Sequence, residues 1–261
     1  MSRPGDDRVV ESDPIIARLR AAGCVFAERE AAFVRRHLVD PGDVERAVTA
    51  RVAGVPLEQA VGVAEFDGVT VAVAEGVFVP RRRAEAIPEA AAAHRPDARI
   101  VVDLGCGSGA LAAAMTRLLP ATQVHAVDLD PTAVVVARAN GRRFGFTAHH
   151  GSWWAGLPRS LRGRVDLAVG YLPHVPSARV DGIHPDFRAH EPRSTVDGGG
   201  DGLDHLRAVV APLAAWLAPG GAFVTLLSVE QAAHVPGRIA WQDDEDAVLV
   251  LDPESVGSWL A

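Results

Sequence analysis

A run of β-branched residues leads into three closely spaced glycines near the middle of the chain. Residues 101–110 read Val-Val-Asp-Leu-Gly-Cys-Gly-Ser-Gly-Ala. Glycine permits a sharp turn with positive φ and lets backbone N–H groups approach a ligand with no Cβ in the way. The alanine-rich residues 110–119 read as a helix that begins at the turn, with its N-terminus facing the ligand. The sequence therefore predicts a strand, a ligand-binding turn and a helix in direct succession.

An acidic residue ends the next apolar run. Asp128 comes directly after residues 123–127, which read Gln-Val-His-Ala-Val. A carboxylate at that place in an α/β fold can accept both ribose hydroxyls of a nucleotide. The pattern predicts an adenosine-containing cofactor. The candidate cofactor-binding residues around the turn are Asp103, Gly105, Cys106, Gly107, Gly109, Asp128 and Leu129.

Composition excludes several other classes of protein. The chain has 261 residues, 48% of them hydrophobic, which is enough for a sizeable core. It contains no lysine, which excludes pyridoxal Schiff-base chemistry, lysine nucleophiles and a Walker-type phosphate loop. The net charge is −7, whereas a nucleic-acid footprint is usually basic. We therefore expect no nucleic-acid partner.

The chain shows no signal for export or membrane insertion. No apolar stretch reaches the roughly 18–20 residues that a membrane-spanning helix needs. The N-terminus lacks the apolar core of a signal peptide, and two cysteines do not make a disulfide framework. We expect a cytoplasmic protein with no membrane partner.

The period of the apolar residues changes along the chain. Residues 1–12 are polar and predict disorder, while helical spacing over 14–57 predicts a small helical domain. Alternation around Asp67 and Gly68 predicts a β-hairpin. Later strands and helices alternate, which is typical of a parallel, doubly wound sheet. The predicted division is a helical domain (1–60), a hairpin and linker (61–98) and an α/β domain (99–261).

Periodicity and turn residues set the expected bounds after the hairpin. Pro131, for example, is suited to the first turn of a helix. The expected strands are 100–104, 123–128, 146–149, 165–169, 222–227, 238–241 and 246–251. The expected helices are 84–94, 110–119, 131–141 and 203–217.

The glycine turn leaves two cofactors to compare. Gly105, Gly107 and Ala110 satisfy the dinucleotide pattern G-x-G-x-x-A, so NAD is an alternative. Against NAD, Asp103 stands where dinucleotide domains usually have an apolar residue, Gly109 adds a third glycine, and a helical domain precedes the motif. The string Asp-Leu-Gly-Cys-Gly-Ser-Gly closely resembles motif I of class I S-adenosylmethionine-dependent methyltransferases. This resemblance implies S-adenosylmethionine as the cofactor.

The resemblance extends over nearly the whole chain. Residues 54–62, residues 77–81 with Glu85, and residues 190–203 are similar to segments of the protein-glutamine N5-methyltransferases, and Gln231 matches too. Those enzymes modify the GGQ glutamine of peptide-chain release factors. The resemblance implies a Rossmann-like class I methyltransferase fold with a small N-terminal helical domain and a linking β-hairpin.

The acceptor loop departs from that family. The family has Asn-Pro-Pro-Tyr directly after a strand, where this chain has Tyr171, Leu172, Pro173 and His174. The family's Asn holds a planar amide or amine through its carbonyl, whereas Tyr171 offers one hydroxyl and a large ring. Three more polar residues of the family are replaced. Ser152 stands for the Asp that binds the adenine amine, Leu226 for an acidic residue of a later strand, and Ala84 for a Thr.

Candidate roles follow from these positions. Tyr171 and His174 are candidate catalytic residues, because an imidazole at a strand's carboxyl end can take a proton from an alcohol or phenol. His174 could instead be a half-exposed loop histidine. Ser152, Trp153 and Tyr171 are candidate cofactor contacts, and Arg81, Pro173 and Glu191 are candidate substrate contacts.

Each of these roles has a plainer alternative. Trp153 could be ordinary core, the arginines at 81–83 could form a solvated face, and Glu191 with Arg193 could form a structural ion pair. The histidine spacings fit no zinc pattern, so no metal is expected.

Four functions are compared on this basis. The favoured one is a methyltransferase that acts on a small molecule or on a protein other than the release factor. The second is release-factor glutamine methylation despite the altered loop. The third is a protein that binds S-adenosylmethionine without methyl transfer, and the fourth, an NAD-dependent oxidoreductase, is remote.

Overall fold

The computed structural model describes residues 13–183 and 185–260, so the disorder predicted for residues 1–12 lies outside the described residues. The chain separates into two compact units, residues 1–61 and 62–261. The finer division into three parts, with a linker at 61–98, stays a prediction.

The first unit is helical. Asp13 and Asp40 each cap a helix by accepting two backbone N–H bonds, and proline follows at the first helical position in both. Leu19 and Ala31 lie in a small core. A partly buried ion pair between Arg51 and Glu30, 2.8 Å long, joins two of the helices. The helices are α1 (Pro14–Ala21), α2 (Ala27–His37), α3 (Pro41–Val52) and a short α4 (Leu57–Val61), which the sequence pattern did not predict.

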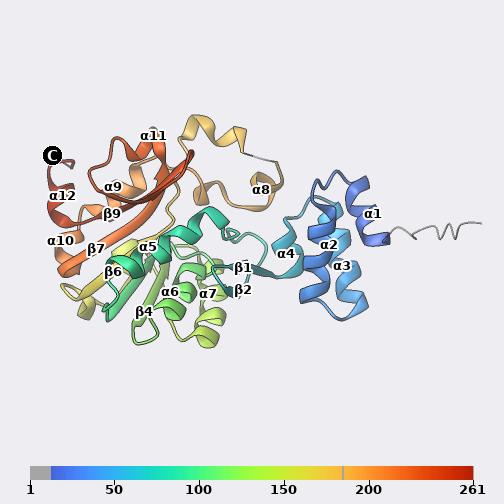
Figure 1. Cartoon of the computed structure of the whole chain (residues 1–261), viewed down its shortest axis with the longest axis horizontal. Coiled ribbons are helices and arrows are strands. Elements are labelled where there is room, and N and C mark those ends of the chain that lie inside the picture. Colours follow the sequence, from blue (N-terminus) through green and yellow to red (C-terminus); the bar gives the residue numbers. More distant parts are fainter. Residues whose placement is uncertain (1–12, 184, 261) are drawn as a thin grey trace, which may run out of the picture. The chain divides into compact units, whose positions relative to one another are not determined.

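The second unit is built on a seven-stranded sheet with the order β5-β4-β3-β6-β7-β9-β8 (Figure 1). Pairs from β5 to β7 are parallel, and β9 runs antiparallel to both neighbours. The chain leaves β3 for β4 on one side and reaches β6 on the other, which opens a crevice at their carboxyl ends. The strands are β3 (Ile100–Leu104), β4 (Gln123–Asp128), β5 (Thr147–His150), β6 (Val165–Gly170), β7 (Leu217–Ser228), β8 (Arg238–Gln242) and β9 (Asp246–Leu251).

Helices cover both faces of this sheet. Successive residues of β3 point to opposite faces, so Val101 joins one core cluster and Val102 the other. Both faces are buried, which explains why β3 and β6 read as apolar runs, each interrupted by a single aspartate, Asp103 or Asp166. The first cluster includes α5 (Ala86–His94), α6 (Ala110–Leu118) and α7 (Pro131–Phe144). The second includes α9 (Asp204–Val210), α10 (Leu213–Trp216), α11 (Val229–Ala232) and α12 (Pro253–Gly257).

Three expected elements differ clearly from the structure, while the bounds of the others differ by two residues or fewer. The helix expected at 203–217 is interrupted at Pro212, because proline lacks the N–H that a continuing helix needs. The helix expected at 131–141 continues to Phe144 and ends at Gly145 in the left-handed conformation. The strand expected at 222–227 extends in both directions as β7. The predicted doubly wound α/β fold is confirmed, with β9 as its antiparallel strand.

The predicted hairpin pairs β1 (Val63–Phe66) with β2 (Val69–Ala72) around Asp67 and Gly68. Asn140 of α7 ties it to the glycine turn. Its side-chain oxygen accepts the Ala72 N–H, and its amide nitrogen donates to the carbonyls of Ala72 and Ser108, at 2.8–2.9 Å. This buried amide was not found from the sequence, because its partners are remote in the chain.

Candidate functional site

A cavity of about 560 Å³ lies at the carboxyl ends of β3, β4 and β6. Its size falls within the range of small-molecule sites. The glycine turn forms one side of it, and Tyr171 and Pro173 of the loop after β6 form another. Asp128 and Trp153 also line it. The structure thus brings together most of the residues that the sequence singled out.

The turn keeps the conformation that its glycines predict. Gly105, Gly107 and Gly109 have φ of 72°, 53° and 81°. At Gly109 an added Cβ would meet the Phe146 ring at 2.5 Å, so a side chain is excluded by contact as well as by φ. The N–H groups of Gly105 and Cys106 both donate to the carbonyl of Val127, which fixes the turn against β4.

Asp128, the last residue of β4, faces the turn. Its Oδ2 accepts the Gly107 N–H at 2.8 Å, and its Oδ1 accepts the Asp130 N–H at 2.9 Å. Burial raises the pKa of Asp128, and these backbone bonds oppose the shift. A carboxylate has about four acceptor positions, so each oxygen keeps one for a further donor. Asp130 caps α7 by accepting the Thr132 N–H, directly before the Pro131 that the sequence placed in the first turn.

Asp103 lies beneath the turn and is fully buried. Its Oδ2 accepts the Ala112 N–H at 3.0 Å, whereas its Oδ1 has no hydrogen-bond partner among the described residues. Burial, with a smaller contribution from Asp128, raises the pKa of Asp103 to about 7. The hydroxyl of Ser108, in the cavity wall, is likewise buried without a partner in the described part of the chain.

These features fit an adenosine-containing cofactor. The free acceptor positions of Asp128 suit two ribose hydroxyls, and the glycine backbone leaves room beside them. The hydroxyl of Ser108, which lines the cavity, would otherwise cost free energy as an unsatisfied buried polar group. Asp103 is not among the described residues that line the cavity, so its predicted cofactor contact stays a prediction. Leu129 and Ser152 also border the cavity.

Trp153 forms the wall between the turn and α9. Its backbone is left-handed, with φ of 44°, a conformation that is uncommon outside glycine. Its ring lies where a Cβ on Gly105 would meet it at 2.9 Å, and it packs against the His205 ring at 5.6 Å between centroids. The structure thus places Trp153 at the cavity rather than deep in the core.

The loop after β6 combines an aromatic and an imidazole ring. Tyr171 lies 5.3 Å from His174 and 5.9 Å from Phe78, measured between ring centroids. Burial raises the pKa of Tyr171 to about 12, so its hydroxyl keeps its proton at neutral pH. His174 contacts the Leu172 carbonyl through Nδ1 at 2.8 Å, and burial lowers its pKa. His174 packs behind Tyr171 and is not among the described residues that line the cavity.

Among the arginines at 81–83, Arg81 and Arg83 make side-chain contacts, while Arg82 and Arg83 are exposed, so a solvated face describes the cluster only in part. Arg81 lies over the Phe78 ring and pairs with Glu191 at 2.6 Å, while Arg83 pairs with Asp246 at 3.3 Å. Glu191 also accepts the Val79 N–H at 2.9 Å.

The ion pair expected between Glu191 and Arg193 was wrong. Glu191 pairs with Arg81 instead, and Arg193 contacts Asp197 at 2.9 Å. The reason is that Arg193 opens a short 3-10 turn that carries its side chain toward Asp197.

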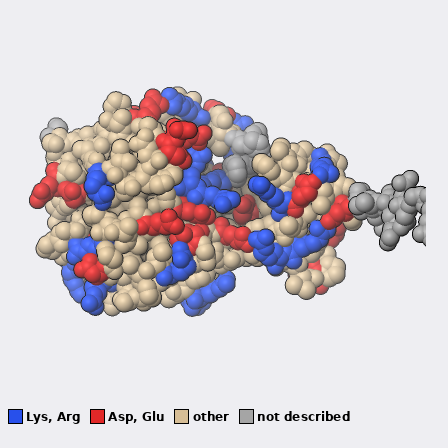
Figure 2. Space-filling model, viewed as in Figure 1, with Lys and Arg blue, Asp and Glu red and all other residues tan. Residues whose placement is uncertain are grey.

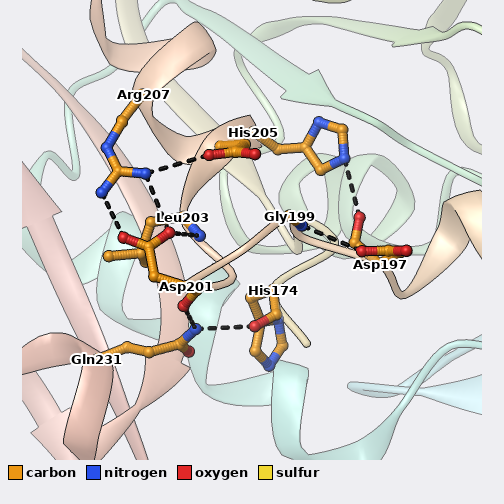
Figure 3. Close-up of polar contacts among 9 residues, drawn as sticks. His174, Asp197, Gly199, Asp201, Leu203, His205, Arg207 and Gln231 are labelled. Carbon is orange, nitrogen blue, oxygen red and sulfur yellow. Dashed lines mark hydrogen bonds and ion pairs between the residues drawn. The ribbon is translucent and has the colours of Figure 1, made fainter. Parts of the chain in front are cut away.

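A glycine-rich loop, residues 197–203, is fastened to the acceptor loop (Figure 3). Gln231 donates through Nε2 to the carbonyls of His174 and Asp201, at 2.8 and 3.1 Å. Gly198 donates its N–H to the Val175 carbonyl at 2.8 Å. An added Cβ at Gly202 would meet the His174 carbonyl oxygen at 2.2 Å, so the two loops touch through backbone.

His205, at the first turn of α9, also lines the cavity. Sequence reasoning missed it, because nothing in its local pattern distinguishes it from the other histidines. Only its neighbour Trp153 was singled out.

Surface charge and helix composition relate to the expected absence of nucleic-acid and membrane partners. On the face shown in Figure 2, acidic and basic side chains are interspersed and form no single basic stripe. None of the helices in the described part of the chain has both the length and the apolar character to cross a membrane.

Comparison with known proteins places the chain in a family. Residues 89–155 match the family model of ribosomal protein L11 methyltransferase (PrmA). The release factor glutamine methyltransferase of Geobacter sulfurreducens is 35% identical over 211 residues, which is 80% of this chain and 73% of that protein. The one from Gloeobacter violaceus is 38% identical over 173 residues, 64% of this chain and 59% of that protein.

A solved structure supports the fold. The Thermus thermophilus 16S rRNA N2 G1207 methyltransferase (RsmC), in complex with AdoMet and guanosine, superposes with a TM-score of 0.53 and 20% identity. The match covers 73% of this chain and 49% of that one. The resemblance inferred from the sequence is confirmed: the chain belongs to the release factor glutamine methyltransferase family and is an S-adenosylmethionine-dependent methyltransferase.

Proposed function

We propose that this enzyme transfers the methyl group of S-adenosylmethionine to an acceptor other than the release-factor glutamine. The observation that carries this proposal is the wall at the carboxyl end of β6. Tyr171 and Pro173 border the cavity there, and neither carries the carboxamide with which the family's Asn holds a planar amide. A phenol ring at this place suits a smaller or differently shaped nucleophile.

On the cofactor side, the proposed work of the chain is positioning. Asp128 accepts the ribose hydroxyls, and the glycine turn brings its backbone close to the rest of the cofactor. S-adenosylmethionine supplies a methyl group on a sulfonium, which a nucleophile displaces directly. Alignment is the main contribution that such a displacement requires of a protein.

On the acceptor side, His174 is the proposed base. Because His174 is not among the described residues that line the cavity, its proposed access to the acceptor is a shift of the Tyr171 ring packed against it. Because a carbonyl can only accept, the contact with Leu172 means that Nδ1 carries the proton and Nε2 keeps a lone pair. The lowered pKa of His174 keeps the ring neutral at physiological pH. A hydroxyl acceptor needs such a base, whereas an amine or a carboxylate needs little assistance. Arg81, Glu191 and Pro173 are the proposed substrate contacts.

The test is a methyl-transfer assay with labelled S-adenosylmethionine. A bacterial release factor is incubated in parallel with a panel of small amines, phenols, alcohols and carboxylates. Transfer to a member of the panel, with no methyl group on the GGQ glutamine by mass spectrometry, is the expected result. Methylation of that glutamine would overturn the proposal.

Glutamine methylation is the second candidate. It is favoured by the relatives, which carry that name at 35% and 38% identity. The same assay decides between the two. Binding of S-adenosylmethionine with no transfer to any acceptor would contradict both candidates and favour a binding protein.

A further inference from the structure

The cavity wall near α9 lacks the family's carboxylate. Ser152 and His205 stand there instead, on either side of Trp153. The hydroxyl of Ser152 and Nδ1 of His205 have no hydrogen-bond partner among the described residues, so both can meet a ligand.

The tautomer of His205 follows from its one hydrogen bond. Its Nε2 lies 3.1 Å from the carbonyl oxygen of Asp197. Since the carbonyl can only accept, Nε2 carries a proton, and this is the imidazole tautomer whose lone pair lies on Nδ1. Figure 3 shows the bonded nitrogen directed at Asp197 and the other ring nitrogen turned away from it. His205 therefore presents an acceptor to its surroundings.

The orientation of the His205 ring is held by Asp197, which is itself fixed by several hydrogen bonds. The Asp197 carboxylate accepts from the Ser177 hydroxyl at 2.5 Å, from Arg193 Nε at 2.9 Å and from the Gly199 N–H at 3.1 Å. These bonds fix the segment whose carbonyl binds His205. Trp153 packs against the ring on another side. An acceptor that is held in place before binding discriminates between donors and acceptors on a ligand.

We propose, building on the use of S-adenosylmethionine above, that Nδ1 of His205 accepts a hydrogen bond from the exocyclic amine of the adenine. His205 would thereby replace the carboxylate that the family supplies at position 152, with Ser152 as a weaker neighbour. The same lone pair faces the carbonyl of a 6-oxo purine unfavourably. His205 is thus a specificity-determining residue for the base of the cofactor.

The test measures base selectivity, which a purely structural role would not change. Calorimetry gives the affinity of the folded protein for S-adenosylhomocysteine and for S-inosylhomocysteine, in which hypoxanthine replaces adenine. His205→Phe keeps a ring against Trp153 but has no acceptor. We expect it to weaken S-adenosylhomocysteine binding about 3- to 10-fold and to reduce the preference for adenine about 5- to 10-fold.

Two further variants sharpen the result. His205→Asn places an amide oxygen near the position of Nδ1 and should retain most of the preference for adenine. His234→Phe, at an exposed histidine, is the matched control and should change neither affinity.

The outcomes separate the two proposals. A preference unchanged within twofold in a folded His205→Phe variant would overturn the role of His205 alone. A folded wild-type chain that binds neither compound would overturn the proposed function itself.

Discussion

The cofactor side of the cavity is formed mainly by backbone groups, whereas the acceptor side is formed mainly by side chains. On the cofactor side, backbone N–H groups, three glycines and one carboxylate set the shape, and Asp128 bonds mainly to backbone. On the acceptor side, the side chains of Tyr171 and His174 face each other, and charged pairs from remote segments surround them. Because the acceptor side depends on side chains, amino-acid substitutions there can change which acceptor is bound. The cofactor side depends on backbone conformation and can stay unchanged.

The largest effect is expected from His174→Ala. Loss of a general base lowers kcat about 10²- to 10⁴-fold. The affinity for S-adenosylhomocysteine should stay within about twofold, since His174 lies outside the cofactor side of the cavity. The measurements are steady-state kinetics with a hydroxyl acceptor from the panel, and calorimetry. His234→Ala serves as the control, and unchanged turnover would remove His174 from the mechanism.

Asp128→Ala should weaken cofactor binding, because Asp128 lies on the cofactor side of the cavity. Two hydrogen bonds from ribose to a charged group are lost, so affinity for S-adenosylhomocysteine should fall about 100-fold. Asp97→Ala, at an exposed carboxylate, should leave the affinity unchanged. An Asp128→Ala affinity within threefold of the wild type would contradict the ribose contact.

The free energy of unfolding of the unliganded protein should depend on pH through the titration of Asp103. Its pKa is about 7 in the folded state and near 3.8 when unfolded, so between these values the folded state binds more protons. The contribution of Asp103 to the free energy of unfolding is therefore largest at low pH and is lost as the pH rises toward 7. The loss amounts to about 2 kcal/mol between pH 5 and pH 7.

Asp103→Asn isolates that contribution. Partly buried histidines such as His125, whose pKa is lowered by desolvation, act in the opposite direction, so the wild type alone is not decisive. The comparison is the difference in urea-unfolding free energy between the wild type and Asp103→Asn across this range. Parallel pH profiles for the two proteins would show that Asp103 does not titrate there.

The smallest effect is expected from Gln231→Ala. Two partly buried hydrogen bonds, to the carbonyls of His174 and Asp201, are lost, which costs about 1–2 kcal/mol of unfolding free energy. Turnover should fall, because the acceptor loop loosens, while cofactor affinity changes little. Glu230→Ala changes an exposed neighbour in a surface ion pair and should cost less. Equal losses for both variants would argue against Gln231 as a fastening residue.

Local patterns predicted most of the fold. The strand at Ile100–Leu104 and the strand at Gln123–Asp128 have the bounds expected, because apolar runs end at turn residues there. Pro212 was the main exception. It interrupts a helix whose apolar spacing continues on both sides, so periodicity alone did not reveal the break.

The candidate site was predicted less evenly. Asp128 and Tyr171 border the cavity because they stand at the carboxyl ends of β4 and β6, the two parallel strands that flank β3, and a sequence can indicate such positions. Arg81 and Glu191 were named separately, and only the structure pairs them. Asn140 and His205 carry no local signal, since Asn140 bonds to Ala72 and His205 packs against Trp153, both far away in the chain.

The sequence alone determined the glycine turn and the carboxylate opposite it, because their conformation depends on the absence of Cβ atoms and on residues that follow one another. The tertiary structure decided which groups share the cavity wall, which carboxyl is buried deeply enough to raise its pKa, and which loops are fastened together. Those outcomes depend on packing between segments remote in the chain, where burial removes water and leaves each polar atom dependent on its neighbours.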